Sequence, residues 1–286
     1  MITTTTKHEV PIIYIQPARG WIGLNLFDLW AYRELIYFLT WRDIKVRYKQ
    51  AVLGVGWALI QPLMTMVIFT VIFGGFAKLP PDAGMPQSWY PVFSYAGLLP
   101  WGLFQNALQR SGVSLVGSAN LLTKVYFPRL IIPIAAVGAG LVDFMISLLI
   151  MGVLMVVFQV PFSWNLLWLP LLVVFALMTA LAVGLWLSAL NVQYRDVQHM
   201  IPFLLTAWMY ASPVAYSIDI IQVSPFWRMV YGLNPMAGVI QGFRWALLGS
   251  SPPDGLMLVS VIVVIVLLVS GLFYFRRMER NFADTV

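Results

Sequence analysis

Few side chains of this sequence could do chemistry, and one carboxylate, Asp143, is unusual because it lies inside a long apolar run. The chain has no cysteine and only two histidines, so we expect no thiol chemistry and no metal site. It lacks the phosphate-binding pattern GxxxxGK followed by Ser or Thr, and Leu59 stands where a dinucleotide fingerprint starting at residue 54 would need glycine. The patterns of zinc-dependent and serine hydrolases, HExxH and GxSxG, are also absent. We therefore expect no catalysis by this chain and no cofactor on it.

The composition determines what kind of element must position Asp143. Hydrophobic residues make up 60% of the 286 residues and charged residues 10%, whereas a soluble domain is about 45–50% apolar and about 25% charged. The apolar excess falls into six runs, at residues 53–75, 92–108, 131–158, 169–190, 201–216 and 256–275. Runs of this length and character cross bilayers as helices. The sequence predicts an all-α polytopic membrane protein with six transmembrane helices, and excludes a soluble enzyme, a disordered protein and a secreted disulfide scaffold.

The basic residues predict the orientation of these spans. Six spans place both termini on one side, together with 14 of the 17 lysine and arginine residues, and leave only Lys78, Arg228 and Arg244 on the other. By the positive-inside rule, both termini are expected in the cytoplasm. The net charge of +6 is therefore a topological signal, and no basic block has the size of a nucleic-acid site.

Three regions should depart from straight spans. The second run contains Pro100 and the fifth contains Pro202 and Pro213, so these runs are expected to be kinked or partly re-entrant. Residues 217–255 are too long for a turn and mix polar breaks with apolar pieces, notably 236–248, which predicts two short helices dipping into the outer leaflet.

Residues 28–42 have the periodicity of an amphipathic helix lying on the cytoplasmic membrane surface. The apolar face is predicted to hold Leu29, Tyr32, Leu35, Ile36 and Leu39, and the opposite face Arg33, Tyr37 and Thr40. We divide the chain into a cytoplasmic N-terminal segment, 1–51, and a transmembrane domain with a short cytoplasmic tail, 52–286.

A carboxylate at the depth of Asp143 costs about 2.5–3.5 kcal/mol on insertion scales, so it should face a wet channel or a partner. Gln105, Asn106 and Arg110 are candidate partners, and the sequence leaves open whether the pairing is structural or acts in translocation. Small residues at positions 176, 180, 184 and 188 form a helix face that could pack within one subunit, which is the default, or against a second copy.

Four motifs, in order, give the chain a resemblance to a known family. They are WRDIKVRYKQ at 41–50 with VLG at 52–54 and WALIQPL at 57–63, KVYFPR at 124–129, NVQYRDV at 191–197, and NPM at 234–236 with GFRWALLG at 242–249. Together they resemble the permease subunits of ABC-2 type polysaccharide exporters, which carry O antigen, capsule or teichoic acid. The stretch QPARGW at 16–21 looks more like the O-antigen branch.

The resemblance implies a homodimer in the cell inner membrane, paired with two copies of a separate ATPase subunit that binds ATP and Mg and powers export of a lipid-linked polysaccharide. Residues expected to couple to that ATPase are Asp28, Arg33, Asn120, Lys124, Tyr126, Arg195 and Asp196. For Asn120, Lys124 and Tyr126 the alternative is an ordinary connector loop, and for Arg195 and Asp196 it is an internal Arg–Asp pairing that closes their turn. A cluster at Arg42, Lys45, Arg47 and Lys49 could steer an anionic lipid-linked substrate, or could serve only topology and headgroup contact.

Aromatic rings could stack on sugar faces along a channel, or could belong to the interfacial aromatic belt of membrane proteins. Candidate channel-lining residues are Trp57, Tyr95, Trp101, Phe104 and Asp143, and a periplasmic gate is assigned to Asn234 and Arg244. Two other functions remain open at this point: export of small amphiphilic drugs or lipids on the same architecture, and a membrane scaffold for glycan assembly without transport.

Overall fold

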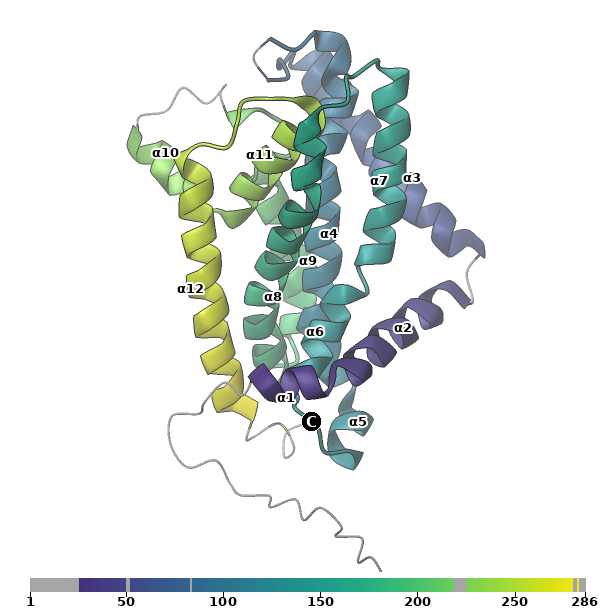
Figure 1. Cartoon of the computed structure of the whole chain (residues 1–286), viewed down its shortest axis with the longest axis vertical. Helices are drawn as coiled ribbons and strands as arrows, with labels where there is room; N and C mark the ends of the chain where they lie inside the picture. Colours follow the sequence, from purple (N-terminus) through teal and green to yellow (C-terminus); the bar gives the residue numbers. More distant parts are fainter. Residues whose placement is uncertain (1–25, 50–51, 83, 219–224, 280–281, 283–286) are drawn as a thin grey trace, which may run out of the picture.

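The computed structural model describes residues 26–49, 52–82, 84–218, 225–279 and 282, and the regular secondary structure within them is helical (Figure 1). The helices of the first half are α1 (Leu26–Ala31), α2 (Arg33–Lys49), α3 (Val52–Phe69), the π-helical turn η1 (Thr70–Phe76), η2 (Gln87–Trp89), α4 (Tyr90–Gly117), α5 (Ala119–Lys124), α6 (Ile131–Gly138) and α7 (Leu141–Val157). Those of the second half are η3 (Trp164–Trp168), α8 (Leu169–Gln193), α9 (Val197–Tyr210), α10 (Pro225–Gly232), α11 (Pro235–Leu248) and α12 (Gly255–Met278).

Four helical segments in the described part of the chain are long and apolar enough to cross a membrane. They are Leu59–Phe76, Ile131–Val157, Trp164–Gln193 and Gly255–Met278. They coincide with the first, third, fourth and sixth predicted runs, which confirms an all-helical chain with several membrane spans. The two remaining runs fall in α4 and α9, and neither helix meets both the length and the hydropathy requirement.

The second predicted run forms the central helix α4, which is longer than expected. It has 28 residues, about 42 Å at a rise of ~1.5 Å per residue, and Pro100 lies inside it without ending it. Helix α4 packs against α3, α6, α7, α8, α9 and α11, so most of its side chains are buried by protein. Because α4 is surrounded by other helices and not by lipid, it can carry polar residues that a lipid-facing span could not.

The fifth predicted run is shorter in the structure than in the sequence pattern. Helix α9 has 14 residues and ends at Tyr210, six residues before the predicted boundary, and the chain turns at 211–214. Pro213 accounts for this end, because the residue before a proline is pushed out of helical geometry and the proline has no N–H to donate. The described part of residues 217–255 contains two short helices, α10 and α11, which agrees with the predicted number of helices there.

The small-residue face of α8 packs within the subunit. Ala176, Ala180, Gly184 and Ser188 are all buried, and α8 makes its most extensive packing with α4. A Cβ atom on Gly184 would stand 2.5 Å from the Ser111 hydroxyl, so a glycine is needed for this close approach. The intrasubunit alternative for this face is confirmed.

The predicted N-terminal helix is present but is divided in two by a turn at Tyr32, between α1 and α2. Taken over its whole length, α2 shows almost no separation into an apolar and a polar face, so the amphipathic pattern expected from residues 28–42 does not extend along this helix. Leu39, from the apolar face, is buried against the bundle, and Thr40, which the pattern placed on the opposite face, also meets the bundle by donating to the Ala135 carbonyl at 3.2 Å. Tyr32, which the pattern placed with Leu39, is exposed. Helix α2 lies against α6 at the lower end of the bundle (Figure 1). Aromatic side chains of α2 such as Tyr37 are exposed.

Candidate functional site

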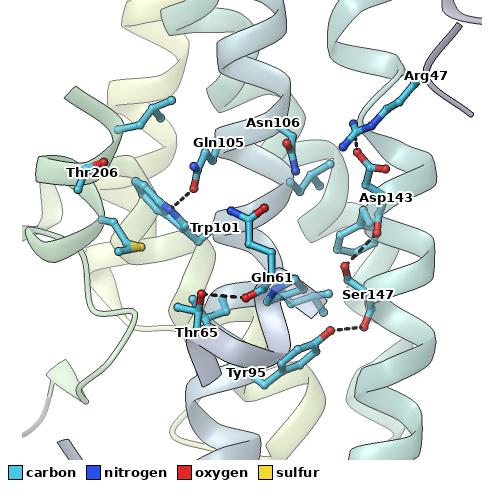
Figure 2. Close-up of a pocket in the computed structure, with 18 residues that line it drawn as sticks. Arg47, Gln61, Thr65, Tyr95, Trp101, Gln105, Asn106, Asp143, Ser147 and Thr206 are labelled. Atoms are coloured by element: carbon cyan, nitrogen blue, oxygen red, sulfur yellow. Dashed lines mark hydrogen bonds and ion pairs between the residues drawn. The ribbon is translucent and has the colours of Figure 1, made fainter. Parts of the chain in front are cut away.

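A cavity of about 240 Å³ lies between α3, α4, α7 and α9 (Figure 2). This volume would hold about eight water molecules at ~30 Å³ each. Its polar lining comes from four helices and includes Gln61 and Thr65 of α3, Tyr95, Trp101, Gln105 and Asn106 of α4, Asp143 and Ser147 of α7, and Thr206 of α9, with Arg47 at its edge. A polar space of this size is unusual in an apolar helix bundle and marks this region as the candidate site.

Asp143 joins three elements at one end of this cavity. It sits in the first turn of α7 with a side chain only 8% exposed. Arg47 donates from Nη1 to Oδ2 of Asp143, Tyr48 donates its hydroxyl to Oδ1, and Arg110 of α4 reaches Oδ2 at 3.4 Å. Burial and this bond to Asp143 raise the pKa of Tyr48 to about 12, so the hydroxyl stays protonated and can donate. We call Arg47, Tyr48, Arg110 and Asp143 the charge cluster.

The partners of Asp143 were found only in part from the sequence. Arg110 was a candidate and is confirmed, but Arg47 and Tyr48, 96 and 95 residues away in the chain, were missed. Of the other candidates, Gln105 accepts from Trp101 Nε1 at 3.0 Å, and Asn106 lines the cavity. A sequence signal for Arg47 existed, since it is a cation at the end of a helix that precedes a span, but periodicity does not reveal which helix it will meet.

The four basic residues predicted to steer a substrate, which lie in the second half of α2, do not all face the same way. Arg42 pairs with the neighbouring Asp43 at 2.8 Å, and Lys45 lies 5.5 Å from the centre of the Trp41 ring. Lys49 is exposed, whereas Arg47 turns inward to Asp143. A groove of about 470 Å³ separates α2 from α4 and α6, and Arg42, Arg47 and Arg110 all line it.

The predicted channel aromatics differ in what they face. Tyr95 and Trp101 line the cavity, with the Tyr95 hydroxyl donating to the Ser147 carbonyl at 3.1 Å (Figure 2). Phe104 is fully buried instead, with ring centres 5.3 Å from Trp101 and 5.1 Å from Trp208. It belongs to the packed core and is not among the residues that line the cavity. Trp57 lies in α3, and its side chain falls outside the described residues.

The residues predicted to couple to an ATPase gather mostly at the lower end of the molecule. The short helix α5 projects there beyond the bundle, with Asn120 and Lys124 exposed and Tyr126 just after it 79% exposed (Figure 1). Arg195 and Asp196 are exposed in the turn between α8 and α9.

Two further predicted coupling residues lie near α1, and one interaction ties the α5 region to the last helix. Arg33 donates to the Trp30 carbonyl at 3.5 Å, and Asp28 lies in α1 with its side chain outside the described residues. The backbone N–H of Arg129, at the end of the KVYFPR motif, donates to Oε1 of Glu279 at 3.2 Å, which follows α12 directly. The segment that follows α5 is therefore hydrogen-bonded to the residue that caps the end of α12.

The two predicted gate residues are both fixed by hydrogen bonds. Asn234 caps α11 by accepting from the Met236 N–H at 3.1 Å, accepts from Trp208 Nε1 at 2.9 Å, and donates to the Ser212 hydroxyl at 2.9 Å. Arg244 is 3% exposed and donates to the carbonyls of Val214 and Tyr216 at 2.7 and 3.0 Å. Both side chains join α11 to the segment that follows α9.

Comparison with known proteins agrees with this arrangement. Residues 34–248 match the ABC-2 type transporter family. The chain is 31% identical to the O-antigen export system permease protein RfbA of Myxococcus xanthus, over 91% of this chain and 98% of that protein. It is 28% identical to the protein of the same name from Klebsiella pneumoniae, over 88% and 94%, and 24% identical to the polysialic acid transport protein KpsM of Escherichia coli, over 83% and 91%.

The family match covers most of the chain, from the start of α2 to the end of α11, and so includes the charge cluster, the cavity, α5 and the capped α11. The matched residues thus form a helical bundle with several apolar helices, a polar cavity between them and a projecting helix at one end. The chain belongs to the ABC-2 type transporter family.

Proposed function

We propose that this chain is the transmembrane permease subunit of an ATP-driven exporter that carries a lipid-linked polysaccharide, in the first place lipopolysaccharide O antigen, from the cytoplasm across the inner membrane. The polar cavity that ends in the charge cluster is the structural observation that carries the proposal. Each unpaired polar group of a glycan in hydrocarbon costs on the order of several kcal/mol. Such a cargo needs a polar path, and the names of the relatives specify the cargo class.

In this proposal the chain has six spans, formed by α3 with η1, by α4, by α6 with α7, by α8, by α9 and by α12. Helices α10 and α11 dip into the outer leaflet, and both termini face the cytoplasm. The distribution of basic residues supports this topology. So does the burial of α4, most of whose side chains are covered by neighbouring helices, which explains why it is less apolar than the other proposed spans.

The working unit is proposed to contain two copies of this chain and two ATPase subunits, with ATP and Mg bound on the ATPase. Helix α5 and the exposed Tyr126 offer that partner a projecting contact at the lower end. Closure of the ATPase pair would push α5, and the bond between Arg129 and Glu279 would carry the movement to α12. Helix α2, which rests on α6 and holds Asp143, would move with this end.

Deletion of this chain tests the proposed function. In cells without it, lipid-linked polysaccharide should accumulate on the cytoplasmic side and disappear from the surface, and the chain supplied from a plasmid should restore both. A strain that still makes the glycan but lacks the partner ATPase is the matched control and should show the same accumulation. Normal surface polysaccharide in the deletion strain, with no redundant exporter, would contradict the proposal. It would favour export of small amphiphiles, or a scaffold if ATPase loss also has no effect.

A further inference from the structure

The charge cluster separates two spaces that the molecule offers to a ligand. The groove between α2, α4 and α6 is lined by Arg42, Arg47 and Arg110, and the cavity between α3, α4, α7 and α9 is lined by Asp143 and the amides beside it. Arg47 lines both spaces, and Arg110 and Asp143 meet at the boundary between them. Anything that passes from the groove into the cavity must therefore pass the charge cluster.

The balance of charge in the cluster is uneven. Two arginines share one carboxylate, and both use Oδ2 of Asp143, so the cluster carries a net charge of +1. The arginine side chains are 34% and 25% exposed, whereas Asp143 is 8% exposed. The cations are thus accessible from the groove, while the anion is not. A guanidinium has five N–H donors in a fork that matches phosphate oxygens, and each arginine here uses only part of that fork.

We propose that Arg47 and Arg110 form a binding site for the phosphate or pyrophosphate group of a lipid, and that Asp143 fills this site in the absence of the lipid. The inference rests on the proposed function and adds a recognition step to it. A phosphate arriving through the groove replaces the carboxylate on the two arginines. Asp143 then turns to the amides that surround the cavity, those of Gln61 and Asn106, which are oriented into the same space (Figure 2).

This exchange releases the end of α2 from α7. Arg47 and Tyr48 are consecutive residues at the end of α2, and both are held by Asp143. When the carboxylate leaves them, the contact between α2 and α7 at this point is lost, and the boundary between groove and cavity opens. The carboxylate therefore keeps the passage closed until an anionic headgroup competes for the same donors.

The proposal makes an unusual prediction about the sign of mutational effects. Asp143→Asn removes the competing carboxylate, so an anionic lipid should bind about tenfold more tightly. Arg47→Gln and Arg110→Gln should each weaken binding by about tenfold. Each factor of ten corresponds to about 1.4 kcal/mol. Arg277→Gln is the matched control, because Arg277 is an exposed cation of α12 that lines neither space, and it should leave affinity unchanged.

The measurement is equilibrium binding of geranylgeranyl pyrophosphate to the full chain in nanodiscs of neutral lipid. Three other probes define the ligand: geranylgeraniol, inorganic pyrophosphate and phosphatidylglycerol. The lipid pyrophosphate should bind more tightly than all three. If geranylgeraniol binds equally well, the site does not recognise the phosphate group. If phosphatidylglycerol binds equally well, the site takes bulk membrane lipid. Either result would overturn the proposal. Tighter binding of inorganic pyrophosphate than of the lipid form would do the same.

Asp143→Asn leaves two arginines without a carboxylate, which can destabilise the fold. A double variant, Asp143→Asn with Arg110→Gln, is therefore tested as well, because it keeps the net charge of the cluster at +1. It should bind more tightly than Arg110→Gln alone. If folded Asp143 variants bind no tighter than their parents, Asp143 positions the arginines and does not compete. This failure is distinct from failure of the proposed function, because the deletion strain would still lose surface polysaccharide. If binding behaves as expected while export is normal, the site stands and the cargo assignment falls.

Discussion

Two arginine sites at opposite ends of the bundle show how the same side chain serves different purposes. Arg244 is surrounded by fixed groups: two backbone carbonyls, and the ring of Phe93, whose centre is 3.7 Å from Cζ. Arg47 instead contacts a single carboxylate on another helix and borders two open spaces. Backbone carbonyls cannot leave without moving the chain, but a carboxylate can change rotamer. Arg244 therefore stabilises structure, whereas Arg47 is placed to exchange partners.

Loss of the Arg244 site should have the largest effect on the stability of the chain. Arg244→Leu leaves the carbonyls of Val214 and Tyr216 without donors, at about 1–3 kcal/mol for each buried group. Arg244→Lys should also destabilise, because one ammonium cannot reproduce the fork that spans both carbonyls. Thermal unfolding followed by tryptophan fluorescence in detergent should show a large fall in midpoint for both variants. Arg277→Leu, at an exposed position, is the control; an equal midpoint for Arg244→Leu would remove the contrast between the two sites.

A larger side chain at Gly97 of α4, next to Arg244, should reduce stability by a smaller amount. A Cβ atom at Gly97 would stand 2.7 Å from the Val214 carbonyl oxygen and 2.8 Å from Nη2 of Arg244. Gly97→Ala should therefore destabilise the chain by about 1–3 kcal/mol, the usual range for overpacking. Gly102→Ala on the same helix meets nothing within 4 Å and should be neutral or stabilising. Similar unfolding midpoints for the two variants would show that the Arg244 site can relax.

Replacement of Arg47 should affect polysaccharide export more than the stability of the chain. Arg47 is 34% exposed, and Arg110 remains beside Asp143 when it is replaced, so Arg47→Gln should change stability by no more than about 1 kcal/mol. Surface polysaccharide should nevertheless fall in a strain that carries only this variant. Quantifying surface glycan and unfolding midpoint on the same variant checks both statements. A large fall in midpoint together with normal export would reverse the roles that we assign to Arg47 and Arg244.

The sequence located Asp143 and Arg244 but did not reveal what either side chain would contact, and the reasons are physical. Hydropathy located the four apolar spans, since each has its own signal, and the cost of a buried charge pointed to Asp143. The partner Arg47 is 96 residues away, and pairing at that distance depends on how α2 crosses α7, which helical periodicity does not specify. Arg244 was assigned to a gate from its position, but its backbone partners could not be inferred, because backbone carbonyls leave no trace in a sequence.

The same limit explains where local patterns failed. The periodicity of 28–42 placed Leu39 and Thr40 on opposite faces, yet both meet the bundle, because α2 packs on α6 and Thr40 donates to the Ala135 carbonyl there. Phe104 and Trp101 are three residues apart and look alike in the sequence, yet only Trp101 reaches the cavity, because the Trp208 ring of α9 covers Phe104. Aromatic content predicts a lined path only after tertiary packing has decided which rings are already buried.

The smallest effect on stability is expected where neither arginine site is involved, at the projecting end. Replacing Lys124 and Tyr126 together with alanine should change stability by about 0.5 kcal/mol or less, since Lys124 is exposed and Tyr126 is 79% exposed. Copurification of the partner ATPase should fall, because these side chains would lie in the contact. Lys78 and Phe76 form a matched control: an exposed lysine and an 83% exposed aromatic, outside α5. Their replacement should leave copurification intact. If both pairs behave alike, α5 does not dock the ATPase, and movement of the charge cluster must be driven from α2 instead.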